Sequence, residues 1–336
     1  MVDGHDEAPP ATVVVVGASA GGVESLSRLV ADLDANLDAP VLVVLHTAPG
    51  ESFLPRILAR AGPLPAEHAG DGEPLAANRI YVAPPDRHLL VTRDAVRVVR
   101  GPQENGVRPA IDPLFRSAAV AFGPRAVAVV LTGSLDDGAA GCAAVSRHGG
   151  TVIVQDPDEA PFPSMPLHAI AADHPEHVLG LARMGAAVTE AVERARTLPV
   201  EEPRDDQDAH EVELAELEFD TGRGSRLGEE SPFSCPTCGG VLREAPDDVL
   251  RFRCRVGHAF GADSLLHAQT ETVDDALWMA LRALQERAEL STRLAKRMRE
   301  RGRARLTARY EQRVEEAEQA AVAIRGLLLE RDAEPA

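Results

Sequence analysis

The sequence predicts an α/β fold, a doubly wound, mostly parallel sheet with helices on both faces. Continuous apolar runs such as residues 12–16 (TVVVV) and 41–45 (VLVVL) are typical of strands that are buried on both faces. Segments with the helical spacing of apolar residues alternate with these runs across residues 11–198. Glycine-containing turns follow the strands, and the first of them is at residues 17–22. Together these observations predict one α/β domain over residues 11–198.

The expected elements of this domain alternate in type along the chain. In order, they are a strand at 12–16, a helix at 23–33, a strand at 41–45, a short helix at 57–61, short strands at 79–82 and within 89–99, a helix at 114–121, a strand at 126–131, a helix at 139–148, a strand at 151–154 and a helix at 182–195. Apolar and polar residues alternate in 79–82 and 89–99, and we expect a hairpin around Arg93 and Asp94.

The rest of the chain divides by composition. Residues 1–10 are acidic and polar, and we expect them to be a disordered lead-in. Residues 199–230 are predicted to be an acidic linker, because residues 201–220 contain ten acidic residues and one arginine, which is typical of a solvated segment. A small Cys/His module follows at residues 231–262. Because the linker stands between them, we expect this module to be thermodynamically independent of the α/β domain.

Residues 272–330 are rich in alanine and arginine and have helical periodicity. Their apolar residues form two stripes, one of Leu277, Leu281, Leu284, Ala288, Ala295 and Met298 and one of Tyr310, Val314, Ala317, Ala321, Ile324 and Leu328. Gly302 is the predicted break between two helices. We expect a helical hairpin or coiled coil, whose stripes pack on each other, mediate self-association or bind a partner helix.

Composition and charge exclude several classes of function. The chain has 336 residues, enough for about two domains of ~150 residues each. Its formal net charge is −18 and only 3% of its residues are aromatic, so we expect no nucleic-acid binding. No apolar run approaches the ~18 residues of a membrane span, and the N-terminus does not have the pattern of a secretory signal. We therefore expect a cytoplasmic protein that does not insert into membranes.

The first candidate for chemistry is Ser19, in residues 17–21 (GASAG). This stretch fits G-x-S-x-G at a strand-to-helix turn, which is the context that the nucleophile motif requires. The helix that follows supplies free N–H groups for an oxyanion. The alternative is the phosphate-binding turn of a dinucleotide site, which expects an Asp or Glu at the end of the second strand. That strand ends in His46, a base, which favours a hydrolase.

Two further candidates follow other strands. His46 comes directly after residues 41–45, and residues 131–138 (LTGSLDDG) follow the strand at 126–131. Because the carboxyl ends of parallel strands meet at one edge of a sheet, we expect Ser19, His46 and an Asp of this loop to lie together. The acid would orient the imidazole and stabilise its charged form. The chain order Ser, His, Asp differs from that of ordinary α/β-hydrolases, so this is a different hydrolase lineage or not a triad.

Six segments between residues 13 and 188 carry a resemblance to a known family. They are VVVVGASAGG, VLVVLHTAPGESFLPRIL, RIYVAPPDRHLLV, RPAIDPLFRSAA, VVLTGSLDDGAAG and the QD…MP stretch at residues 155–166. In order and spacing they resemble the catalytic domain of the bacterial chemotaxis protein-glutamate methylesterases. The resemblance implies that Ser19 is the nucleophile, His46 the base and Asp137, the residue directly before a glycine, the acid. It also implies hydrolysis of γ-glutamyl methyl esters on chemoreceptors or related signalling proteins, and deamidation of receptor glutamines, without a cofactor for catalysis.

Three features depart from the family pattern. Ala20 stands where the family usually has Thr, and Ser134 and Leu135 stand where Met-Gly is usual. We expect the backbone amides of Ala20 and Ser134 to hold the oxyanion, because backbone donors survive side-chain changes. The resemblance begins at the first strand, so the sequence predicts a form without the family's phosphoacceptor receiver domain.

Cys235, Cys238, Cys254 and His258 form the second constellation. Their spacing, C-x₂-C and then C-x₃-H after fifteen residues, offers three thiolates and an imidazole, which suits tetrahedral Zn²⁺. The alternative is a chance cluster of core cysteines, which a segment too short for its own core disfavours. Since no ligand position is left open, we predict a structural zinc site.

Two rival functions stand beside the methylesterase. One is a non-catalytic adaptor that uses the hydrolase scaffold to bind a receptor and the zinc and helical tail to recruit partners. Activity on a methyl ester separates the adaptor from the enzyme. The other rival is a nucleotide-binding oxidoreductase, which His46 disfavours and which a dinucleotide titration would test.

Overall fold

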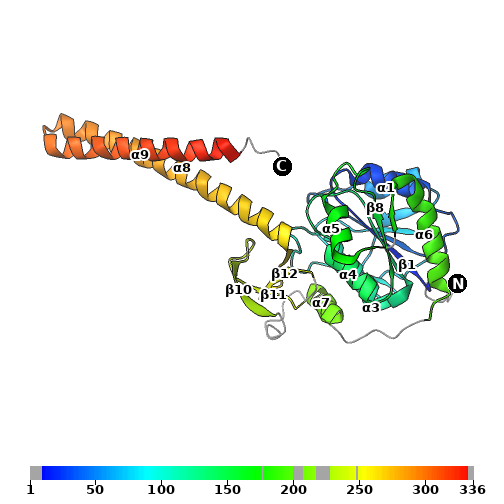
Figure 1. Cartoon of the computed structure of the whole chain (residues 1–336). Helices are drawn as coiled ribbons and strands as arrows, with labels where there is room; N and C mark the ends of the chain where they lie inside the picture. The colour runs from blue at the N-terminus through cyan, green and yellow to red at the C-terminus, as the bar shows by residue number, and fades with distance from the viewer. Residues whose placement is uncertain (1–9, 176, 200–206, 217–227, 247–248, 332–336) are drawn as a thin grey trace, which may run out of the picture. The chain divides into compact units, whose positions relative to one another are not determined.

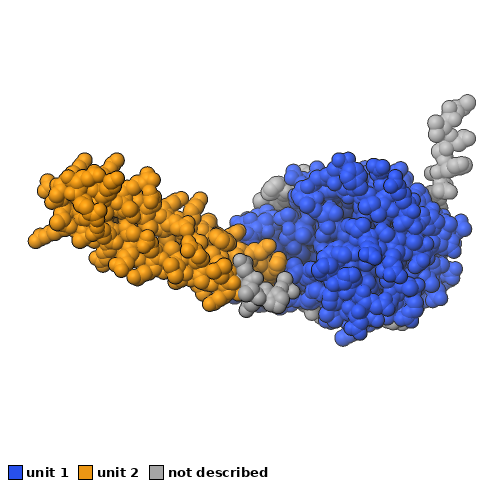
Figure 2. Space-filling view, turned by 90° about the horizontal axis from the view of Figure 1, so that it is seen from above, with its two compact units in different colours: residues 1–265 blue, residues 266–336 orange. Residues whose placement is uncertain are grey.

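The structure, a computed structural model of the chain, describes residues 10–175, 177–199, 207–216, 228–246 and 249–331 (Figure 1). The chain divides into two compact units, residues 1–265 and 266–336, which are coloured separately in Figure 2. The first unit contains the α/β sheet together with the Cys/His module, and the second contains paired helices. Except for residue 10, the predicted lead-in lies outside the described residues.

A parallel sheet of seven strands forms the centre of the first unit, in the order β3-β4-β2-β1-β7-β8-β9. The strands are β1 (Val13–Ala18), β2 (Val41–Leu45), β3 (Ala66–His68), β4 (Ile80–Val82), β7 (Ala126–Val130), β8 (Thr151–Gln155) and β9 (His177–Leu179). The chain winds outward from β1 first to β2 and later to β7, so the sheet reverses its direction of winding beside β1. In sheets of this kind, ligands bind at the carboxyl ends of the strands where the winding reverses.

Helices cover both faces of the sheet (Figure 1). On one face lie α1 (Gly22–Ala31), α2 (Leu54–Ala61) and α6 (Leu181–Arg196). On the other lie α3 (Ile111–Phe122), α4 (Ala139–Arg147), α5 (Ser164–Asp173) and a hairpin of β5 (His88–Val91) and β6 (Val96–Val99); a short 3₁₀ turn, η1 (Gly123–Arg125), follows α3. Val14 and Val16 face the first layer, whereas Val13 and Val15 face the second. Since both faces of β1 are buried, its apolar run is continuous, and the predicted fold class is confirmed.

Besides the 3₁₀ turn η1, three elements of the α/β unit were not expected from the sequence: β3, β9 and α5. β3 and β9 have three residues each and form the two edges of the sheet, so they are too short to show a periodic pattern. Helix α5 also has no clear apolar periodicity. The expected strand at residues 79–82 joins the parallel sheet as β4, and β5 and β6 alone make the hairpin.

The predicted linker contains an ordered helix, α7 (Gln207–Glu216). Its Asp208 and Glu211 are each only 5% exposed, which differs from the solvated segment that the acidic composition predicts. The reason is that arginines from other parts of the chain pair with these carboxylates: Arg147 binds Asp208, and Arg251 binds Glu211. The remainder of residues 201–220 lies outside the described residues.

The Cys/His module is a four-stranded antiparallel sheet in the order β10-β11-β12-β13. Its strands are β10 (Glu229–Ser234), β11 (Val241–Glu244), β12 (Arg251–Cys254) and β13 (Ala259–Gly261). The module has few core side chains; Phe233 packs edge-on against Phe252, with ring centroids 5.3 Å apart. It belongs to the same compact unit as the parallel sheet, which argues against the expected independence.

The predicted helical pair is present as α8 (Ala262–Glu300) and α9 (Ala304–Arg331). Gly302, with a φ of 68°, lies at the break between them, as the sequence predicts. Leu281 of one stripe packs with Ala321 and Leu328 of the other. Pairing with another chain stays a prediction. Among the residues that the structure describes, no helix has both the length and the hydropathy needed to cross a membrane.

Candidate active site

Ser19 lies in the turn between β1 and α1, at the carboxyl edge of the sheet. Its amide donates to the Thr132 carbonyl at 3.0 Å, which joins this turn to the loop that follows β7. The approach is so close that a Cβ built on Gly133 would lie 2.9 Å from Ser19 Cβ and 2.0 Å from Met165 Sδ. Glycine at position 133 therefore allows the two loops to meet around the Ser19 side chain.

His46 lies between Ser19 and Asp137. Its Nδ1 is 3.0 Å from Ser19 Oγ, and its Nε2 is 2.7 Å from Asp137 Oδ2. The three residues follow β2, β1 and β7, which are adjacent in the sheet, so the parallel topology brings them to one edge. The structure thus brings together Ser19, His46 and Asp137, and it is Asp137, not Asp136, that contacts the imidazole.

Asp137 is 3% exposed, and backbone and side-chain donors surround its carboxylate. Oδ2 accepts the Ile111 amide at 2.7 Å, and Oδ1 accepts the Asp112 amide at 3.2 Å and Asn105 Nδ2 at 2.9 Å. The two amides belong to the N-terminal turn of α3, where the helix dipole favours a negative charge. Burial would raise the pKa of Asp137, but the hydrogen bond and charge of His46 and these donors lower it below its ordinary value.

Asp136 points to a different part of the unit. Its carboxylate accepts the amides of Asp263 and Ser264 at 3.0 and 3.2 Å, and it also accepts the Ser264 hydroxyl. These donors lie in the first turn of α8, so Asp136 caps that helix. Burial raises the pKa of Asp136. The neighbouring Leu135 has a φ of 63°, a left-handed conformation that is uncommon for a branched residue.

Ala20 lies in the turn between β1 and α1, and Ser134 lies in the loop that follows β7. Two amides close by in the sequence are engaged: Gly22 donates to the Ser19 carbonyl at 2.8 Å, and Gly133 to the Phe162 carbonyl at 2.9 Å. Within the described part of the chain, no hydrogen bond occupies the amides of Ala20 and Ser134. Free backbone N–H groups are the donors from which an oxyanion hole is built, so the role expected for these two amides stays a prediction.

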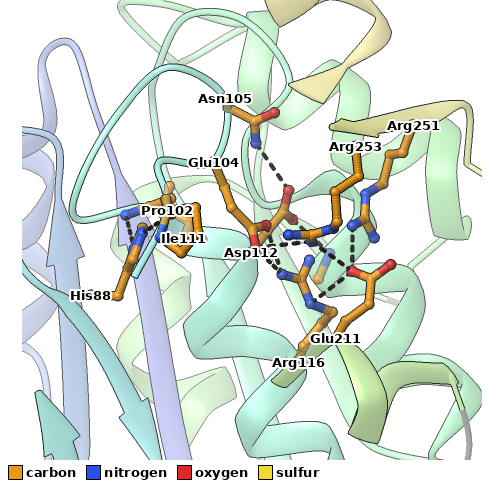
Figure 3. A network of polar contacts seen from close by, with 12 residues as sticks. His88, Pro102, Glu104, Asn105, Ile111, Asp112, Arg116, Glu211, Arg251 and Arg253 are labelled. Carbon is orange, nitrogen blue, oxygen red and sulfur yellow. Dashed lines mark hydrogen bonds and ion pairs between the residues drawn. The ribbon is translucent and has the colours of Figure 1, made fainter. Parts of the chain in front are cut away.

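Sequence reasoning missed Asn105 and Asp112, which support the Asp137 carboxylate. The Asn105 side chain donates to Asp137 Oδ1 at 2.9 Å and to Asp112 Oδ2 at 3.0 Å. Figure 3 shows the second of these bonds. Asp112 Oδ1 in turn accepts the amides of Gly138 and Gly141 at 3.1 and 2.7 Å. Burial and the charge of Asp137 raise the pKa of Asp112 to about 7. The dipeptide Asn105-Gly106 is a turn signal that could have marked this position, although not its partners.

The four predicted metal ligands also meet in space. One ligand atom from each of Cys235, Cys238, Cys254 and His258 lies within 4.8 Å of all the others. The Gly239 amide donates to the Cys235 carbonyl and the Gly257 amide to the Cys254 carbonyl, forming two tight turns around the cluster. Three sulfurs and one imidazole nitrogen fit the tetrahedral coordination of Zn²⁺. Cys142 is buried away from this group in α4, where burial raises the pKa of its thiol.

Comparisons with known proteins identify relatives of the α/β part of the chain. A model of the CheB methylesterase family matches residues 14–188. A protein-glutamate methylesterase/protein-glutamine glutaminase of Anaeromyxobacter dehalogenans is 45% identical over 177 residues, which is 52% of either chain. Another, from Myxococcus xanthus, is 40% identical over 181 residues, 53% of this chain and 51% of its own. The chain thus spans about half the length of the curated relatives it matches.

A solved structure extends the comparison to the fold. The CheB methylesterase catalytic domain of Thermotoga maritima is 32% identical and superposes with a TM-score of 0.52. The match covers 54% of this chain and 98% of that domain. The family match spans the β1 turn, the end of β2 and the loop after β7, which hold Ser19, His46 and Asp137. The chain therefore belongs to the CheB methylesterase family.

Proposed function

We propose that this protein is a serine hydrolase that removes methyl groups from glutamate γ-methyl esters of chemoreceptors or related signalling proteins. The observation that carries the proposal is the hydrogen-bonded chain from Ser19 Oγ through His46 to Asp137, with distances of 3.0 and 2.7 Å. The CheB family match and the relatives named protein-glutamate methylesterase support the choice of substrate.

The orientation of the imidazole supports a route for the first proton transfer. Nε2 faces the ionised Asp137, so a neutral His46 carries its proton on Nε2 and leaves Nδ1 free to accept the Ser19 proton. Ser19 Oγ then attacks the ester carbonyl, and the amides of Ala20 and Ser134 stabilise the oxyanion. Asp137 holds the tautomer and stabilises the imidazolium that forms.

The second half of the reaction regenerates the enzyme. The imidazolium returns its proton to the departing methoxide, so methanol leaves and an ester between Ser19 and the substrate glutamate remains. His46 then activates a water, which hydrolyses this acyl-enzyme to free glutamate and restores the Ser19 hydroxyl. A receptor glutamine would form the same acyl-enzyme with ammonia as the leaving group, and relatives carry glutaminase in their names. We propose that neither reaction requires a cofactor.

We further propose that Cys235, Cys238, Cys254 and His258 bind one structural Zn²⁺. The four ligands fill a tetrahedral shell and leave no position for substrate or water, so the ion would stabilise the fold of the module and take no part in ester hydrolysis.

Methanol release from a methylated receptor fragment tests the hydrolase proposal. Ser19→Ala should abolish release, whereas Ser27→Ala should retain it, because Ser27 is half-buried on α1 and its hydroxyl only donates to the Val23 carbonyl. Both variants should unfold at the temperature of the wild type, since neither hydroxyl belongs to the core. Wild-type protein that binds the receptor fragment but releases no methanol would favour the adaptor instead. Full activity in Ser19→Ala would exclude Ser19 as the nucleophile.

A further inference from the structure

We propose that Asn105 is a positioning residue through which the Cys/His module holds the acid of the active site, so that efficient hydrolysis requires the folded, metal-loaded module. The inference rests on the proposed function, because the acid in question is Asp137 of the proposed triad. It replaces the expectation of an independent module with a direct coupling between the module and the chemistry.

The side chain of Asn105 has three partners, and one of them is in the module. Its Nδ2 donates to Asp137 Oδ1 at 2.9 Å and to Asp112 Oδ2 at 3.0 Å. Its Oδ1 accepts the amide of Gly261, the last residue of β13, at 2.7 Å. The two bonds to carboxylates use both N–H groups of the side-chain amide. The bond from Gly261 to the side-chain oxygen then fixes which end of the amide faces the carboxylates. Asn105 therefore joins the proposed catalytic acid to β13.

The backbone around Asn105 adds a short strand to the edge of the module. The Ala259 amide donates to the Gln103 carbonyl at 3.2 Å, and the Asn105 amide donates to the Ala259 carbonyl at 2.7 Å. Glu104 and Ala259 form a parallel bridge between these bonds. Ala259 directly follows His258, one of the four metal ligands. The residue that pairs with the segment carrying Asn105 is therefore the direct neighbour of a proposed metal ligand.

Buried ion pairs hold this segment in place. Glu104 is 2% exposed and binds Arg116 of α3 at 2.6 Å and Arg253 of β12 at 3.0 Å (Figure 3). Arg253 directly precedes the ligand Cys254, and it also binds Glu211 of α7 at 3.2 Å. A buried charge that loses its partner is costly, so this network favours one docked arrangement of the module. Figure 3 shows the arginines from β12 and α3 converging on the two glutamates.

The conformation of Asn105 explains why this residue type suits the position. Its φ is 54°, in the left-handed region that asparagine tolerates well. Its side-chain amide also donates to two buried carboxylates, Asp112 and Asp137, which would otherwise repel each other. If the module unfolds, the bond from Gly261 to the side chain and the bond from the Asn105 backbone amide to Ala259 are both lost, so the module no longer holds this residue in place. The donor to Asp137 is then lost from its fixed position, and the acid no longer holds His46 in the reactive geometry.

Two substitutions at Asn105 separate its contacts. Asn105→Gly keeps the left-handed backbone and removes every side-chain bond. Asn105→Asp keeps an acceptor for the Gly261 amide but replaces the donor to Asp137 with a third carboxylate. Arg243→Ala is the matched control, because Arg243 lies in the module and pairs there with Glu230, which is exposed.

The experiment measures kcat and KM on a short peptide with a glutamate γ-methyl ester, for zinc-loaded protein and after chelation. We expect chelation to lower the kcat of the wild type by about 10- to 100-fold with little change in KM, since the acid acts in the transition state. Asn105→Gly and Asn105→Asp should show a comparable loss while zinc-loaded. Chelation should lower the kcat of Asn105→Gly only slightly further, because both changes break the same link. Arg243→Ala should behave as the wild type.

A spectroscopic readout tests the coupling without relying on activity. The proton between His46 Nε2 and Asp137 should give a low-field NMR resonance, which the spectrum of His46→Gln assigns by its absence. We expect this resonance in the zinc-loaded wild type and its loss or shift after chelation and in both Asn105 variants. A resonance that responds in this way in a protein that releases no methanol would support the coupling while refuting the esterase. The coupling would be overturned, and the esterase left intact, by an active protein whose resonance and kcat do not change on chelation or in the Asn105 variants. It would also be overturned if the losses in kcat from chelation and from Asn105→Gly multiply.

Discussion

Asp136 and Asp137 are consecutive residues whose carboxylates bind different parts of the molecule. Asp137 Oδ2 lies 2.7 Å from His46 Nε2, whereas Asp136 accepts the amide of Asp263 at 3.0 Å in the first turn of α8. Both residues lie in the bend and turn before α4, where the Ala139 amide donates to the Asp136 carbonyl at 3.1 Å, and their side chains leave this turn in different directions. The loop after β7 thus serves the proposed active site with one acid and a helix N-terminus with the next, and the two provide a matched pair for mutagenesis.

Asp137→Asn should lower kcat on a small methyl ester by about 10⁴-fold, because the amide cannot stabilise the imidazolium or fix its tautomer as a carboxylate does. Asp136→Asn should leave kcat within a few-fold of the wild type, since asparagine also caps helices and residue 136 does not contact His46. Steady-state kinetics of the two variants measure the difference. A larger loss in Asp136→Asn than in Asp137→Asn would show that Asp137 is not the catalytic acid.

The contributions of Ser19 and His46 should not be additive. His46→Ala should lose nearly as much activity as Ser19→Ala, and the double variant should lose little more, because the two residues act as a unit. The rate of methanol release from the same methylated receptor fragment measures all three. Losses that multiply in the double variant would mean that His46 contributes by a route other than activating Ser19.

Cys235→Ser should reduce the zinc content of the purified protein from one ion per chain, because it removes one of four ligands. Cys142→Ala is the control, since Cys142 is buried in α4 and belongs to a different cluster of side chains. Hydrogen exchange should show lost protection in β11 and β12 only in Cys235→Ser. Stoichiometric zinc in that variant would mean that other residues hold the metal.

The stability of the protein should depend on the ionisation of Glu104 in acid. Burial opposes its charge, but Arg116 and Arg253 outweigh burial and lower the pKa of Glu104 from 4.5 to about 2. Because the pKa of Glu104 is lower in the folded than in the unfolded state, its ionisation stabilises the folded state at a pH above 4.5. This stabilisation is lost as the pH falls from about 4.5 towards 2. Urea unfolding across this range should give a wild-type stability that falls more steeply than that of Glu104→Gln. Parallel curves would show that Glu104 is not preferentially ionised in the folded state.

Sequence reasoning reached the residues at the strand ends but not those that support them. The continuous apolar runs of β1, β2 and β7 fix which residues follow them, and parallel topology then brings Ser19 and His46 together. The choice between Asp136 and Asp137 came from the family resemblance, because the local pattern of two acids before a glycine is the same for either role.

The supporting contacts join residues that are remote in the sequence. Asn105 binds the amide of Gly261, 156 positions away, and Glu104 binds Arg253, 149 positions away. No local pattern records such pairs. The acidic stretch around Glu211 was interpreted as a solvated linker for the same reason: the arginines that neutralise it lie in α3 and β12.

The buried ion pairs also extend beyond the part of the chain that matches the family. The family match ends at residue 188, but Arg116, with a side chain 0% exposed, uses Glu211 as well as Glu104 as a partner. A fragment that ends at residue 188 would retain Ser19, His46 and Asp137. It would lack Glu211, a partner of this guanidinium. It would also lack Gly261 and Asp263, whose amides donate to Asn105 Oδ1 and to the Asp136 carboxylate. The family match spans 175 residues (14 to 188), whereas the compact unit that contains it extends to residue 265.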